Sequence, residues 1–154
     1  MPSSPSRLEL ELATLDDARL AQAQVRRFAE ACSFDRTAQW QIATAASEAA
    51  TNAVKHGGGG RLILTTLAAP TPGLRFEARD RGPGIDDLEL AIRDHVSRGV
   101  DLRGLDRPAK ADGLGTGLGA IGRLMDAWGW ENLDGGARLW AEKYLPRSPR
   151  RPRG

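Results

Sequence analysis

The sequence predicts an α+β fold in which helices cover one face of an antiparallel sheet. Three observations predict it: short stretches that alternate apolar and polar residues, longer stretches with apolar residues at helical spacing, and a turn between two of the alternating stretches. The chain has 154 residues and no internal repeat, which is the size of one domain with its own core. We therefore expect one domain over residues 7–146, between a disordered start (1–6) and a basic Pro/Arg-rich tail (147–154).

The first half of this domain is predicted to hold one strand and two helices. Residues 7–13 alternate leucine with charged residues, which indicates a half-buried strand. A helix over about 16–32 and a second over about 35–56 follow, and the second ends at the glycines 57–60, because glycine adopts the left-handed conformation without a clash. The first helix has apolar residues at helical spacing: Ala21, Val25, Phe28 and Cys32.

The second half begins with a hairpin whose strands, 62–67 and 74–78, are joined by the turn Pro70–Gly73 and lead into Asp80. A short helix is expected over 88–95. Residues 96–112 have no period and many charges, which is typical of a long mobile loop or lid. The expected order then closes with a helix over about 117–127 and strands near 128–133 and 137–145.

Composition and charge exclude several classes of protein. No stretch reaches the roughly 20 apolar residues that cross a bilayer, no secretory signal is visible at the start, and Cys32 has no second cysteine to pair with. These observations favour a soluble protein of the reducing cytoplasm. The net charge is +2, but the tail holds four arginines, so the rest of the chain carries −2. The tail is interpreted as a solvated end, and nucleic-acid binding through it ranks far behind.

Two polar residues of the second helix form the first part of a candidate site. Glu48 and Asn52, four residues apart, lie on the flank of the helix, and His56 continues their row. Both can point into a cleft along the edge of the sheet, although such a pair alone is most often a solvated polar edge. On a helical projection the buried side consists of Ile42, Ala46, Ala49 and Ala53.

The second part is the turn Asp80-Arg-Gly-Pro-Gly84, which follows a predicted strand. Asp80 places a carboxylate at the strand end, where it can accept a hydrogen bond from an exocyclic amine. The two glycines, Gly82 and Gly84, let another molecule approach the backbone closely. A turn without a ligand is the alternative.

The third part is a run of glycines over 113–119, ahead of and inside a predicted helix, with Gly122 beyond it. Glycine in a helix interior costs about 1 kcal/mol relative to alanine, so the run needs a compensating reason. Phosphate binding at the helix start is one reason, and close helix-to-sheet packing or a hinge are the alternatives. Neither a Gly-x-x-x-x-Gly-Lys-Ser/Thr loop nor a dinucleotide-binding fingerprint after a first strand is present.

Together the three motifs resemble the GHKL (Bergerat-fold) ATPases, and within them the anti-sigma-factor and stressosome-switch serine/threonine kinases of the RsbW and RsbT type. Residues 47–56 look like the family's N box, residues 80–85 like its G1 box, and residues 113–126 like its G2 box with the following helix. The resemblance covers about 8–146. It implies a two-layer α/β sandwich with a mixed, mostly antiparallel sheet.

The resemblance also implies ATP and Mg²⁺ and gives each motif a role. Glu48 would be the general base, Asn52 would coordinate Mg²⁺ through its side-chain carbonyl, and Asp80 would accept a hydrogen bond from the adenine amine. Residues 96–114 would form the ATP lid. The remaining nucleotide-binding residues would be Gly82 and Gly84 at the base, with Gly113, Gly115, Thr116, Gly117, Leu118 and Gly119 at the phosphates.

The sequence departs from the family pattern at two places. Gly135-Gly136-Ala137 stands where the family usually has a Gly-Thr pair whose hydroxyl helps to hold adenine through water. The lid is also longer and more basic than in the RsbT-like members. These departures bear on nucleotide affinity, base selectivity and the choice of partner.

Two functions from different classes follow from the resemblance. The leading hypothesis is a serine/threonine kinase that phosphorylates a STAS-type antagonist or scaffold protein in a sigma-factor or stress-signalling circuit. The alternative is a nucleotide-gated binding module that sequesters a sigma factor or activates a phosphatase with little turnover. Glu48 favours the kinase. The resemblance also allows the chain to form a homodimer.

Overall fold

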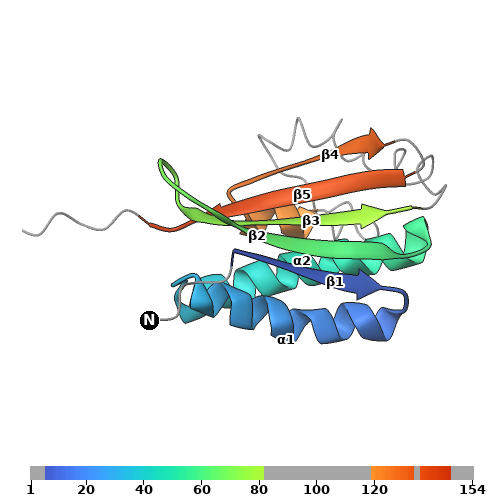
Figure 1. Ribbon diagram of the computed structural model, residues 1–154, viewed down its shortest axis with the longest axis horizontal. Coiled ribbons are helices and arrows are strands. Elements are labelled where there is room, and N and C mark those ends of the chain that lie inside the picture. The colour runs from blue at the N-terminus through green and yellow to red at the C-terminus, as the bar shows by residue number, and fades with distance from the viewer. Residues whose placement is uncertain (1–5, 82–118, 134–135, 147–154) are drawn as a thin grey trace, which may run out of the picture.

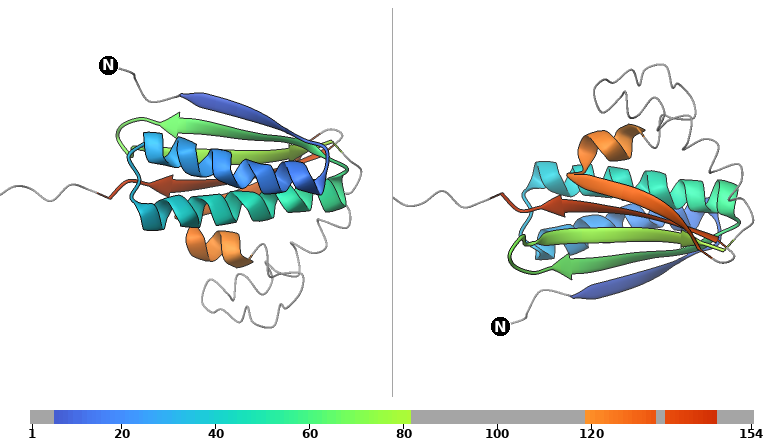
Figure 2. Two further views of the ribbon diagram at one scale, coloured as in Figure 1. Left: turned by 90° about the horizontal axis from the view of Figure 1, so that it is seen from below. Right: turned by 90° about the horizontal axis from the view of Figure 1, so that it is seen from above.

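The computed structural model describes residues 6–81, 119–133 and 136–146, which form two layers, a five-stranded sheet and a layer of helices (Figure 1). The helices α1 (Leu15–Ala31) and α2 (Arg36–Gly57) cover one face of the sheet (Figure 2). The sheet has the strand order β1-β2-β3-β5-β4, with β1 at Arg7–Leu12, β2 at Gly60–Leu67, β3 at Gly73–Asp80, β4 at Ala127–Leu133 and β5 at Gly136–Tyr144. The predicted α+β fold class is confirmed.

All four strand pairings are antiparallel, so the parallel pairing implied by a mixed sheet is not found among the described strands. Between β1 and β2 the chain passes along α1 and back along α2, and each turn reverses its direction. The two strands therefore run in opposite directions, although a helical hairpin separates them in sequence.

Helix α1 begins with a capping box formed by Thr14 and Asp17. The Thr14 side chain accepts a hydrogen bond from the backbone N–H of Asp17, and the Asp17 carboxylate accepts one from the backbone N–H of Thr14. The four apolar residues predicted for its inner side are all buried. Cys32 lies just past the last helical residue and caps the helix end.

Helix α2 can lie close to the sheet because its buried surface is built mainly from alanine. The predicted inner side is confirmed, since Ile42, Ala46, Ala49 and Ala53 are all buried. Three further alanines are buried because α1 packs against a second side of α2: Ala43, Ala45 and Ala50. The helix ends as predicted at glycine, with Gly58 in the left-handed conformation at φ 75°.

The predicted helix over about 117–127 ends earlier than expected. Residues 119–124 are helical and lie beside α2 on the same face of the sheet, and strand β4 already begins at Ala127 (Figure 2). Pairing with β5 stops the helix, because the Asp126 N–H donates to the Glu142 carbonyl and the Asp126 carboxylate accepts from the Tyr144 N–H at 2.7 Å. The Lys143 ammonium donates to the Leu124 carbonyl at 2.7 Å and satisfies one carbonyl of the last turn.

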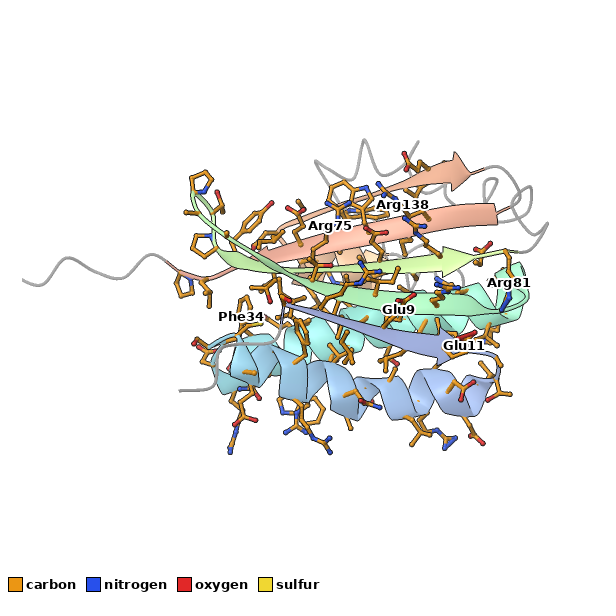
Figure 3. The ribbon with its side chains drawn as sticks, in the orientation of Figure 1. Glu9, Glu11, Phe34, Arg75, Arg81 and Arg138 are labelled. Atoms are coloured by element: carbon orange, nitrogen blue, oxygen red, sulfur yellow. The ribbon has the colours of Figure 1, made fainter. Side chains whose placement is uncertain are left out.

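The face of the sheet away from the helices carries ion pairs instead of an apolar patch. Arg75 and Arg138 lie on this face (Figure 3), and each contacts Glu77. Arg75 also contacts Glu142 at 2.7 Å, and Arg138 contacts Glu131 at 3.1 Å. The arginines of this face are therefore neutralised within the sheet itself.

Several predictions concern residues outside the described part of the chain, besides those for the glycine motifs. They are the short helix over 88–95, the loop or lid over 96–114 and the basic tail over 147–154. The searched part of the chain contains no helix long and apolar enough to cross a membrane.

Candidate nucleotide-binding site

Glu48 and Asn52 lie on the second half of α2, on the flank between its buried and exposed sides, as their spacing predicted. Both side chains are half-buried, whereas Ala49 and Ala53 beside them are buried. Within residues 6–81, 119–133 and 136–146, neither side chain has a hydrogen bond or an ion pair. A carboxylate and an amide thus stand one helical turn apart without a structural task in the described fold.

Asp80 is the last residue of β3, the middle strand of the sheet. Its side chain points to the helix-covered side, as do those of Leu74, Phe76 and Ala78 at alternate positions before it, and it is only 8% exposed. Its Oδ1 accepts a hydrogen bond from the backbone N–H of Ala137 at 3.2 Å. A buried carboxylate at the end of a central strand is an acceptor held in a defined place.

The end of β3 and the end of α2 meet at the same end of the molecule. Asp80 pairs with Gly60, which follows α2 by three residues, and the Arg81 N–H donates to the Gly59 carbonyl at 3.3 Å. Figure 3 shows Arg81 beside the end of α2. The fold thereby brings Asp80 to the end of the helix that carries Asn52.

Two glycines allow the strands beside Asp80 to close around it. A Cβ atom on Gly60 would run into the carbonyl oxygen of Arg79, and one on Gly136 would run into that of Asp80. Any other residue at either position would push β2 or β5 away from β3. The sequence pattern offered a signal for these positions, since each glycine begins a strand after another glycine.

Ala137 lies directly opposite Asp80 in the register of β3 and β5. It is 3% exposed, and its methyl group shares the helix-covered face with the Asp80 carboxylate. The position without the family's hydroxyl is therefore the immediate neighbour of the predicted adenine acceptor.

The glycine run lies mostly outside the described residues. Gly113, Gly115, Thr116, Gly117 and Leu118 are not described, and neither are Gly82 and Gly84. Gly119 is the first described residue of the helix over 119–124, and a Cβ on it would meet only the tip of Arg123 at 3.6 Å. Gly122 supports the packing alternative, because a Cβ there would approach the Trp128 ring to 3.2 Å.

The donor set fits a magnesium ion that is held mainly by a nucleotide. In the searched residues no three His, Cys, Asp or Glu side chains come together as a metal cluster. Mg²⁺ usually keeps several waters and takes one or two protein oxygens together with substrate phosphates. The side-chain carbonyl of Asn52 can supply such an oxygen.

Lys143 is a residue that the sequence analysis missed, and it lies at the other end of β5 from Ala137. Its ammonium holds the end of the helix that follows the glycine run, through the Leu124 carbonyl. The sequence of β5 did contain a signal for Lys143. Leu139, Ala141 and Lys143 occupy alternate positions, and the side chains at these positions face the helices. A lysine at an inward position of a strand indicates a partner on the covered side.

Comparison with known proteins agrees with this geometry. The model of the histidine kinase-like ATPase domain matches residues 12–143. The chain therefore belongs to the histidine kinase-like ATPase domain family, whose nucleotide fold the sequence motifs predicted.

Within this family the chain is of the RsbT/RsbW type. It is 32% identical over 122 residues to the serine/threonine-protein kinase RsbT of Bacillus subtilis (strain 168), across 78% of this chain and 83% of that protein. Among solved structures, a chain in the crystal structure of the SiaB–SiaC complex from Pseudomonas aeruginosa is similar with a TM-score of 0.56 and 12% identity. That match covers 90% of this chain and 89% of the other, and it shows the shared fold.

Proposed function

We propose that this chain is an ATP-dependent serine/threonine kinase whose substrate is a STAS-type antagonist or scaffold protein in a partner-switching circuit of the cytoplasm. One observation carries the proposal. Glu48 and Asn52 lie one turn apart on the flank of α2 without a structural partner in the described chain, and the end of this helix meets Asp80 at the end of β3. The similarity to a serine/threonine-protein kinase over most of the chain supports it.

Each residue has a task in phosphoryl transfer. Asp80 would accept a hydrogen bond from the exocyclic amine of adenine and so orient the nucleotide. Asn52 would donate its carbonyl oxygen to Mg²⁺, which neutralises phosphate charge when bound. Glu48 would accept the proton of the attacking serine or threonine hydroxyl, while that oxygen bonds to the γ-phosphorus and ADP leaves.

The first prediction tests Glu48 as the general base. We expect Glu48→Ala to lower the rate of phosphate transfer from labelled ATP to a STAS-domain protein by roughly 10²–10⁴-fold, because a positioned base contributes about that much. ATP binding, measured by calorimetry with Mg²⁺, should be retained. Thr51→Ala, a half-buried neighbour on another side of α2, is the matched control and should transfer phosphate normally.

Transfer at the wild-type rate by Glu48→Ala would remove Glu48 from the mechanism. ATP binding without transfer by the wild-type protein to its cognate partner would contradict the kinase and favour the second candidate, a nucleotide-gated module that binds a sigma factor or a phosphatase. Ala137 is the observation that favours little turnover, because the residue opposite Asp80 has no hydroxyl to help hold ATP.

A further inference from the structure

One row of side chains runs along α2 and links the candidate base to an exposed surface. Residues four apart on a helix are neighbours and form a continuous ridge. Here the ridge extends from the first residue of the helix to the next to last, and it comprises Arg36, Trp40, Thr44, Glu48, Asn52 and His56. Its middle residues are half-buried and its ends are exposed. Anything that lies along this ridge can contact Trp40 and Glu48 at once.

Trp40 is a large aromatic residue that the fold does not use as core. It is 46% exposed, whereas Trp128, Trp130 and Trp140 are each more buried. The Arg26 guanidinium of α1 stacks over its ring, 4.4 Å from the centroid. This contact orders both side chains at the surface before any partner arrives.

Three arginines of α1 and of the start of α2 make no ion pair in the described part of the chain. Arg26, Arg27 and Arg36 have no ion pair there, and the Arg26 Nε is buried without a hydrogen-bond partner. The nearby Asp35 carboxylate is used to cap α2 through the Ala38 N–H. The arginines on the opposite face of the sheet are each paired with glutamate: Arg7, Arg61, Arg75, Arg79 and Arg138.

We propose that Trp40 and Arg26 form the docking point for the protein that receives the phosphate. This inference rests on the proposed kinase function and names the chemistry of its partner. The partner presents an apolar side chain flanked by a carboxylate, the first to pack on the Trp40 ring and the second to pair with arginine. Tryptophan and arginine are the residue types that most often dominate the energy of an interface.

The geometry also sets the spacing within the partner. Trp40 and Glu48 are eight residues apart, which is about 12 Å along a helix. The docking group of the partner therefore lies roughly 12 Å from its acceptor hydroxyl. Because docking occurs away from the reacting atoms, it contributes to recognition of the partner and leaves the chemical step unchanged.

Binding and turnover test this inference separately. The probe is a purified STAS-domain protein from the same genome, titrated by calorimetry into the Glu48→Ala protein with Mg²⁺ and ATP. Adding Trp40→Ala should weaken binding roughly tenfold or more, as expected for a hot-spot residue. Adding Leu20→Ala is the matched control, since Leu20 is 66% exposed on α1 and should leave binding unchanged. Arg26→Glu should weaken binding and reduce its dependence on salt.

In the transfer assay, Trp40→Ala alone should raise the KM for the partner and leave kcat within about twofold, and Trp40→Phe should recover part of the loss. Equal binding by the Trp40→Ala and parent proteins, or no binding by the parent protein, would overturn the inference. A change in self-association on Trp40→Ala with partner binding intact would overturn it too, since the surface would then serve a second copy. A partner that binds through Trp40 but receives no phosphate would overturn the kinase and leave the docking point standing.

Discussion

At the residue scale, the candidate site depends most on the pair formed by Asp80 and Ala137. Asp80 is buried, and the Ala137 N–H satisfies part of its hydrogen-bonding capacity. The Ala137 side chain adds only a methyl group beside the carboxylate. The described fold thus places a charged acceptor beside an apolar side chain, and β5 supplies no hydroxyl at this point.

Replacing Ala137 with threonine should tighten ATP binding. The new hydroxyl lies next to the Asp80 carboxylate on the same face, where it can hold adenine directly or through water, as the family pattern implies. A hydrogen bond to a charged group contributes about 1.5–3 kcal/mol. We therefore expect the Kd for ATP, measured by calorimetry, to fall roughly tenfold. Ala137→Val is the matched control, because valine has the shape of threonine without the hydroxyl. Equal affinities of the two variants would contradict a role for the hydroxyl.

At the element scale, the start of α1 is fixed by local hydrogen bonds. The Asp17 carboxylate accepts from the backbone N–H groups of Ala13 at 2.7 Å and Thr14 at 3.0 Å. These bonds lower the pKa of Asp17 below its ordinary value, and the bond from Ala13 has the largest effect. The cap therefore needs Asp17 in its charged form.

The stability contributed by Asp17 should depend on pH with a defined sign. A carboxyl group whose pKa is lowered by folding stabilises the folded state above its unfolded pKa, about 3.9, and loses that contribution as the pH falls through the folded pKa. We expect Asp17→Ala to lower the free energy of unfolding at pH 7, measured by denaturant unfolding at a series of pH values. At the acid end of this series the free energy of unfolding of the variant should approach that of the wild type. Asp16→Ala is the matched control, since Asp16 takes no part in the cap. A deficit that stays constant with pH would contradict the ionic cap.

Local patterns predicted most elements because their causes are local. The capping box at Thr14, the helix stop at Gly58 and the alternation that buries Asp80 each depend on residues close in sequence. The flank position of Glu48 and Asn52 follows from helical spacing in the same way. These features were therefore predictable without knowledge of the tertiary fold.

The features that local patterns missed depend on contacts distant in sequence. The helix over 119–124 stops early because Asp126 pairs with Glu142 and Tyr144, which lie 16 and 18 residues further along the chain. Ala43 and Ala50 are buried because α1 packs against α2. The ion pairs on the open face of the sheet depend on which strands are neighbours, and therefore on the strand order. Strand order and register are set by the whole sheet, so a single segment carries little information about them.

At the scale of the whole molecule, the two outer surfaces differ in a way that suits the proposed function. The open face of the sheet is covered with half-buried ion pairs, which leave little unsatisfied charge for a partner. The helix-covered side holds Glu48, Asn52 and Asp80, and Arg26, Arg27 and Arg36 of the helices have no ion pair in the described chain. The proposed recognition of nucleotide and partner would thereby be concentrated on one side of the described fold.

Binding of Mg²⁺ and ATP should stabilise the whole domain, because a ligand that binds only the folded state shifts unfolding by mass action. At a ligand concentration about 100 times Kd the gain is about 2.7 kcal/mol, or roughly 5–10 °C in Tm for a chain of this size. Asp80→Asn should abolish most of this shift, because it replaces one acceptor oxygen with a donor amide that faces the adenine amine. The asparagine oxygen can still accept from the Ala137 N–H, so the variant should remain folded without ligand, with a melting curve close to that of the wild type. A wild-type protein whose Tm responds to neither ATP nor ADP would contradict the nucleotide site itself.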